Sequence, residues 1–124
     1  MAPGKHHSAI IEALDQASIQ TPVEIQVLLS RNVLDFNPLK KCQLWFSKLR
    51  IGENSTHGGI LIYVNTRLKK IALFGDEKIH KKLGQSFWKQ SLRTLQAELR
   101  STHYENAIAI AISKLAENLK HNLK

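Results

Sequence analysis

The sequence is poor in several residue types, and each shortage argues against a class of protein. Cys42 is the single cysteine among 124 residues, so no disulfide can form within the chain. No apolar run approaches the ~18 residues of a membrane-spanning helix, and the first residues lack the apolar core of a secretory signal. We therefore expect a soluble, cytoplasmic protein without membrane insertion, in which Cys42 is a small buried thiol.

Aromatic residues make up only 6% of the chain, so aliphatic side chains must fill most of the core. The common catalytic signatures are absent as well. The sequence has no P-loop, no dinucleotide-binding glycine pattern, no serine-nucleophile motif, no paired cysteines and no His-Glu-x-x-His run. These absences leave enzymatic activity uncertain and favour a non-enzymatic role.

Acidic residues are also few. Ten Asp and Glu stand against 18 Lys and Arg, which gives a formal net charge of +8. Residues 1–62 contribute a net charge of only +1, whereas residues 63–124 contribute +7. The basic second half either faces an anionic partner or is a solvated surface. The same shortage of carboxylates disfavours an acidic metal cage.

The spacing of apolar residues predicts a regular order of helices and strands. Helices are expected over 8–17 and 38–49, over 76–84 and 86–99, and after a capping box formed by Thr102 and Glu105. Strands are expected over 23–29, 60–64 and 71–74. Asn37 and Pro38 start the second helix, and Gly84 ends the third.

This order predicts a three-layer αβα sandwich of the α/β class with a small mixed sheet. The first strand–helix–strand unit should cross over right-handed and give a parallel pair, and the hairpin should add an antiparallel strand. The whole chain, 1–124, fits one domain, with 1–7 and 121–124 as flexible tails. The second helix should bury Leu39, Cys42, Phe46 and Leu49.

Several short motifs together resemble the TPM domain family, which includes thylakoid-lumen proteins linked to photosystem II repair. They are the loop leading into Gly59-Ile-Leu-Ile-Tyr63, the Gly75-Asp-Glu-Lys-Ile-His80 turn, Phe87-Trp88 and the helix from Tyr104 to Leu119. The resemblance covers roughly residues 20–120 and is closest to the soluble, signal-less branch. The chain departs from the family in having Arg100-Ser-Thr-His103 where a glycine is usual.

The resemblance implies an αβα sandwich and, for some members, binding of Ca²⁺ or Mg²⁺. Acid phosphatase activity has been proposed for a plant member. We therefore expect a non-catalytic binding module for a partner protein or, weakly, for a divalent cation. The alternatives are an acid-phosphatase-like hydrolase and nonspecific nucleic-acid binding through the basic half.

A possible metal site follows from the expected direction of the strands. The start of the helix after residue 75 should meet the loop that joins Leu49 to Ile60. That meeting would gather Asp76, Glu77, Glu53, Asn54, His57 and His80. Their oxygens could supply part of a Ca²⁺ or Mg²⁺ shell, and the two histidines with a carboxylate would suit zinc. The alternative is that Asp76 only caps its helix.

The opposite edge of the sheet should gather a basic set. It comprises Arg31, Arg67, Lys69 and Lys70, with Asp35 beside them. Cations after the carboxyl end of a parallel strand could bind phosphate, and Asp35 could act there as nucleophile or base. The alternative is a charged hairpin tip beside a polar loop.

A second basic group lies on consecutive helices and has aromatic residues within it. It comprises Lys78, Lys81, Lys82, Lys89 and Arg93, with Phe87 and Trp88 between them. Such a group could bind nucleic acid through phosphate neutralisation and base stacking. A solvated helix face, with Trp88 in the core, explains the same spacing.

Overall fold

The computed structural model describes residues 8–101 and 103–122. The elements are α1 (Ser8–Gln20), β1 (Glu24–Ser30), α2 (Pro38–Lys48), β2 (Gly59–Asn65), β3 (Lys70–Gly75), α3 (Glu77–Ser101) and α4 (Tyr104–Asn122). No helix within these residues is long and apolar enough to cross a membrane.

The strands form one mixed sheet in the order β1-β2-β3. β1 and β2 are parallel, with Glu24 opposite Gly59 and Ser30 opposite Asn65. β3 returns antiparallel to β2, so that Asn65 pairs with Lys70 at the hairpin. The parallel pair and the antiparallel hairpin are therefore those that the sequence predicts.

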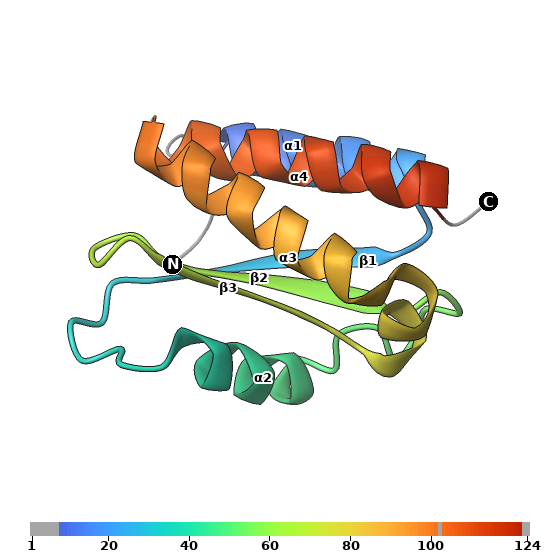
Figure 1. The fold of residues 1–124 in the computed structure, drawn as a ribbon, viewed down its shortest axis with the longest axis horizontal. Helices are drawn as coiled ribbons and strands as arrows, with labels where there is room; N and C mark the ends of the chain where they lie inside the picture. The colour runs from blue at the N-terminus through green and yellow to red at the C-terminus, as the bar shows by residue number, and fades with distance from the viewer. Residues whose placement is uncertain (1–7, 102, 123–124) are drawn as a thin grey trace.

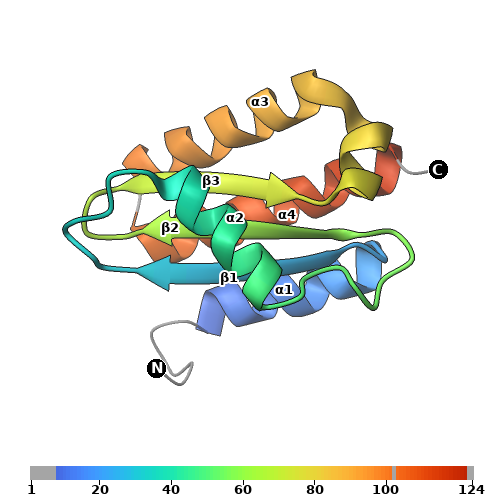
Figure 2. The same ribbon diagram turned by 90° about the horizontal axis from the view of Figure 1, so that it is seen from below.

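Helices cover both faces of this sheet, as Figure 1 and Figure 2 show from two sides. α1, α3 and α4 pack on one face, and α2 alone covers the other. Every residue of the central strand β2 is buried. Alternate residues of β2 enter the two cores: Ile60, Ile62 and Val64 the larger one, and Leu61 and Tyr63 the smaller one beneath α2.

The larger core contains the apolar stripes that the helical spacing predicts. In α4 this stripe is buried and consists of Ile108, Ile112, Leu115 and Leu119. The α/β sandwich expected from the sequence is thus confirmed, with the aliphatic filling that the low aromatic content requires.

The prediction for α2 is wrong at two positions. Cys42 and Phe46 are buried, but Leu39 and Leu49 are about half exposed. Leu49 follows the last helical residue, and the chain then turns, so Ile51 occupies the buried place instead and donates its N–H to the Phe46 carbonyl. Leu39 lies in the first turn of the helix, one turn before the buried Cys42.

The break predicted at Gly84 is present. α3 is two helical segments joined at this residue, whose φ of 76° and ψ of 169° are not helical. The expected capping box includes Thr102, which lies outside the described residues. Glu105, its expected partner, accepts a hydrogen bond from the Ala9 N–H of α1 at 3.0 Å. Of the expected tails, 1–7 and 123–124 also lie outside the described residues, whereas α4 extends to Asn122.

Candidate functional site

Asp76 joins the start of α3 to the loop between α2 and β2, as the strand directions predict. Its Oδ2 accepts a hydrogen bond from the Gly59 N–H at 3.1 Å, and its Oδ1 accepts one from the Ile79 N–H at 3.2 Å. Its own N–H donates to the Gly59 carbonyl at 3.2 Å. The carboxylate therefore caps α3 and fixes the loop at the same time.

The close approach of Asp76 explains two glycines of this loop. A Cβ on Gly52 would lie 2.6 Å from Asp76 Oδ2, and a Cβ on Gly58 would also collide with the carboxylate. Glu24, which the sequence analysis did not consider, lies at the same edge and accepts the Gly52 N–H at 2.9 Å. In the sequence, the only indication of this role of Glu24 is that a charged residue begins β1.

The other residues of the expected metal set have separate surroundings. Glu77 pairs with Lys81 at 3.7 Å, and His57 Nδ1 lies 3.0 Å from Thr56 Oγ1. The ring of His80 lies against that of Trp88, with 4.7 Å between the centroids and a tilt of 32° between the planes. The remaining two, Glu53 and Asn54, are exposed on the loop.

Within 8–101 and 103–122, no three His, Cys, Asp or Glu side chains are grouped as a metal site requires.

At the opposite edge, Asn65 ties the hairpin to the loop that follows β1. Its Oδ1 accepts the N–H groups of Arg67 and Leu68, at 3.1 and 2.9 Å. Its Nδ2 donates to the Asn32 carbonyl at 2.8 Å and to Asp35 Oδ2 at 3.1 Å. This fully buried amide thus links the hairpin turn to the loop after β1. The sequence did not reveal this role, because asparagine is common in turns for purely local reasons.

Asp35 lies beneath this edge and is completely buried. Its Oδ2 also accepts a hydrogen bond from the Tyr63 hydroxyl. Burial of Tyr63, together with that hydrogen bond, raises the pKa of the phenol above its usual value of 10. Within the described residues, Asp35 Oδ1 has no hydrogen-bond partner. A carboxylate enclosed in this way has no direct access to a substrate.

A basic pocket of about 360 Å³ opens beside the hairpin. Its described lining consists of Phe36, Pro38, Lys69, Lys70, Ile71, Gln96, Leu99 and Arg100. Three of these side chains are cationic and none is a carboxylate. The charge suits a phosphate or another anionic group, to which guanidinium and ammonium groups donate charge-assisted hydrogen bonds.

Two of the four cations predicted for this edge line the basic pocket, and two do not. Lys69 and Lys70 belong to it, whereas Arg31 and Arg67 are exposed at the same end of the molecule outside its lining. Arg100 also lines the basic pocket, but the sequence did not predict this, because Arg100 lies about 30 residues after Lys70, at the end of α3. Only the packing of α3 along the sheet brings it to the hairpin.

The basic group on α3 lacks a stacking platform. Trp88 is buried with 8% of its surface exposed, and a Cβ on Gly75 would meet its ring atom Cζ2 at 2.8 Å. Phe87 is half-buried and packs edge-on against Trp88. The lysines of this group are exposed, as on a solvated helix face.

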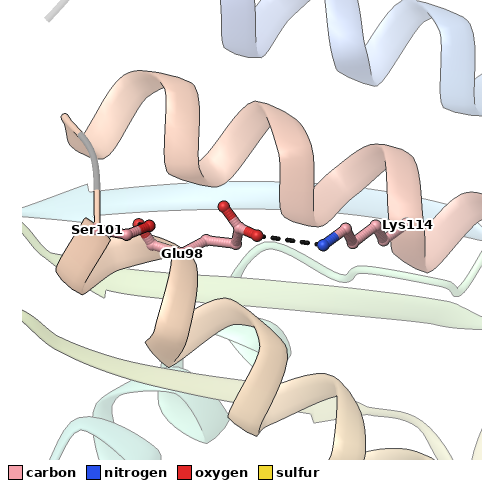
Figure 3. Close-up of polar contacts among 3 residues, drawn as sticks. All are labelled: Glu98, Ser101 and Lys114. Atoms are coloured by element: carbon pink, nitrogen blue, oxygen red, sulfur yellow. Dashed lines mark hydrogen bonds and ion pairs between the residues drawn. The ribbon is translucent and has the colours of Figure 1, made fainter.

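A second hollow, of about 260 Å³, lies between α3 and α4. Lys114 lies on its rim, but its Nζ is 3.1 Å from Glu98 Oε1, an ion pair that links the two helices (Figure 3). Ser101 donates its hydroxyl to the Glu98 carbonyl one turn earlier on α3. The charge of Lys114 is therefore already matched, which makes this hollow a weaker candidate for an anion.

Comparison with known proteins agrees with this architecture. A search of the curated proteins gave no significant match. Among solved structures, the BA42 protein of the psychrophilic bacterium Bizionia argentinensis has a TM-score of 0.84 and 22% sequence identity, and the match covers 98% of this chain and 83% of BA42. The model of the TPM domain matches residues 4–118. The chain therefore belongs to the TPM domain family.

Proposed function

We propose that this TPM-domain protein is a non-catalytic binding module that holds an anionic group of its partner in the basic pocket. The observation that carries the proposal is the meeting of Lys69, Lys70 and Arg100 in one hollow whose described lining includes no carboxylate. Three cations from two distant segments line this hollow, and each would attract an anion bound there.

The distribution of exposed apolar side chains supports a macromolecular partner. Of the large apolar residues that are exposed, seven fall between residues 33 and 49: Val33, Leu34, Phe36, Leu39, Leu44, Trp45 and Leu49. This segment begins beside the basic pocket and continues along α2. Such a concentration of exposed large apolar side chains in one segment favours an interaction site.

The surroundings of Asp35 favour binding over hydrolysis. A phosphatase nucleophile must reach phosphorus, but this carboxylate is enclosed and held by Tyr63 and Asn65. We expect p-nitrophenyl phosphate to be turned over equally slowly by the wild type and by Asp35→Asn. A loss of measurable turnover in that variant, with the fold retained, would favour the hydrolase instead.

The pocket is tested by titrating the ¹⁵N-labelled protein with inorganic phosphate at constant ionic strength, with chloride as the exchanged ion. We expect the amide signals of Lys69, Lys70 and Arg100 to shift and saturate. The double variant Lys69→Gln/Arg100→Gln should bind roughly tenfold more weakly, because two charge-assisted hydrogen bonds are lost.

The matched control is Lys81→Gln/Lys89→Gln, which removes two exposed cations from the first and second segments of α3. It changes the net charge equally and leaves the basic pocket intact. Equal weakening in both double variants would mean that phosphate responds to net charge alone, and the pocket would be rejected.

Divalent-cation binding at the Asp76 edge is the second candidate. The specific observation in its favour is that Asp76 and Glu24 both direct carboxylate oxygens to the 52–59 loop. Titration with Ca²⁺, Mg²⁺ and Zn²⁺ should then move the amide signals of Asp76 and Glu53. Unchanged signals there at millimolar metal would remove this candidate.

A further inference from the structure

The loop between β1 and α2 has an inverted pattern of burial. Asp35 is fully buried, whereas its neighbours Phe36, Leu34 and Val33 are 81%, 66% and 51% exposed. Folding alone favours the opposite arrangement, because apolar side chains gain from burial and a carboxylate is costly to desolvate. We refer to Val33, Leu34 and Phe36 as the apolar loop.

The apolar loop is held in place by polar contacts. The Leu34 N–H donates to Asn32 Oδ1 at 2.9 Å, and the Phe36 N–H donates to the Leu34 carbonyl at 3.0 Å. The Asn32 carbonyl in turn accepts from Asn65. These hydrogen bonds fix the turn with the three side chains exposed. Binding through them therefore loses little conformational entropy of the loop.

The apolar loop and the basic pocket share one residue. Phe36 lines the pocket and is also the most exposed member of the apolar loop. Both views of the ribbon place this loop and the β2–β3 hairpin at the same end of the molecule (Figures 1 and 2). A partner that fills the pocket with an anion must therefore present an apolar region directly beside it.

The two segments beside the basic pocket carry exposed charge of one sign. The segments 31–41 and 66–71 carry Arg31, Lys40, Lys41, Arg67, Lys69 and Lys70, and their one acidic residue is the buried Asp35. A second copy of this chain would bring the same cations against them, so charge repulsion disfavours self-association through this end.

We propose that this end of the molecule binds peripherally to the surface of an anionic lipid membrane, and this inference rests on the proposed anion-binding function. The basic pocket takes a lipid phosphate group, and the apolar loop enters the interface between headgroups and acyl chains. No helix within 8–101 and 103–122 is long and apolar enough to cross the bilayer. An anionic lipid joins a phosphate to apolar chains, as the shared position of Phe36 requires, and a bilayer accepts protruding side chains without needing a matching groove.

The test is cosedimentation of the full chain with vesicles of phosphatidylcholine containing about 30% phosphatidylserine, and with vesicles of phosphatidylcholine alone. We expect binding to the anionic vesicles only. Phe36→Ser should weaken it about tenfold, since an exposed aromatic ring no longer enters the interface. Lys69→Gln and Arg100→Gln should each weaken it about fivefold.

Two matched controls test whether the loss of any exposed apolar side chain, or of any positive charge, would weaken vesicle binding as much. Ile19→Ser removes an equally exposed apolar side chain, 78% exposed at the end of α1, and should bind as the wild type does. Lys89→Gln removes a cation outside the site and should have little effect. Circular dichroism should be unchanged in Phe36→Ser, because the ring packs against little of the protein.

Three results would overturn the inference and still leave the anion pocket measurable by phosphate titration. The first is phosphate binding at Lys69 and Arg100 without any vesicle binding. The second is vesicle binding that Phe36→Ser and Ile19→Ser weaken equally. The third is Phe36-dependent binding of an acidic polypeptide such as polyglutamate, with no binding to vesicles, which would identify a protein partner. Absence of both phosphate and vesicle binding would reject the proposed function as well.

Discussion

At the scale of single residues, the smaller core contains two ionisable groups that burial keeps neutral. Cys42 is fully buried beneath α2, where its Sγ lies 3.5 Å from the Leu61 carbonyl. Burial raises the pKa of the thiol from 9.0 to about 12, partly offset by a hydrogen bond to the backbone of Tyr63. Tyr63 is shifted upwards in the same core. Both groups make the fold sensitive to alkali.

The first prediction concerns this alkaline sensitivity. Above pH 9 the unfolded chain releases the Cys42 proton while the folded chain keeps it up to about pH 12. The stability should therefore be fully present below pH 9 and fall as the pH rises, by up to about 1.4 kcal/mol per pH unit. Urea unfolding between pH 8 and 10 measures it, and Cys42→Ala should lack this fall. A fall of the same slope in Cys42→Ala would refute the assignment.

The second prediction concerns Asp76, whose carboxylate accepts two backbone N–H groups from different elements. Asp76→Ala should lower the free energy of unfolding by about 1–3 kcal/mol, since it removes the cap of α3 and leaves the Gly59 N–H unsatisfied. Asp76→Asn keeps an acceptor oxygen and should lose less. Equal losses in the two variants, measured in urea, would show that charge rather than hydrogen bonding matters here.

At the scale of elements, α3 depends on a break within it. Gly84 has φ 76° and ψ 169°, a conformation that side chains with a Cβ avoid, although a Cβ there would meet no atom within 4 Å. Replacing Gly84 by a residue with a Cβ should therefore lower the stability only through backbone strain, and not through a steric clash. The break allows the second segment of α3 to follow the sheet as far as the hairpin, where Arg100 joins the basic pocket.

The third prediction follows from that geometry. Gly84→Ala should lower the free energy of unfolding by about 1–3 kcal/mol through backbone strain. It should also weaken phosphate binding if the second segment changes direction. Gln85→Ala, an exposed neighbour, serves as the control and should be close to neutral. A Gly84→Ala variant with wild-type stability would mean that the break is not strained.

At the scale of the whole molecule, the two faces of the sheet are stabilised unequally. Three helices share the larger core, whereas α2 alone covers the other face through Cys42, Phe46 and Ile51. Segments with few buried apolar contacts open most readily in the native state. The layer formed by α2 adjoins the apolar loop, so local opening of α2 would affect the proposed membrane contact.

The fourth prediction is that amide hydrogen exchange is faster in the α2 layer than in the larger core. Amides of α2 should exchange by local opening, faster than those of β2 and α4, which should exchange only through global unfolding. Phe46→Ala should speed exchange in α2 more than in α4. Uniform protection across α2, β2 and α4 would show that the molecule opens as one unit.

Part of the candidate site was visible in the sequence. Strand direction correctly placed Asp76 against the 52–59 loop and Lys69 and Lys70 at the opposite edge, because parallel and antiparallel connections fix which strand ends meet. The sequence could not show that Asn65 links two turns or that Arg100 reaches the hairpin. Those contacts depend on how far α3 extends along the sheet.

The sequence by itself determined the order of elements, the pairing of strands and, outside the ends of α2, the main faces that enter the core, because residue spacing and backbone geometry are local properties. The tertiary structure alone decided that Asp35 is enclosed while Phe36 projects into solvent. Which side of an irregular loop faces inwards follows from the groups it packs against. Here Tyr63 and Asn65, from the central strand, draw the carboxylate inwards and leave the apolar loop outside.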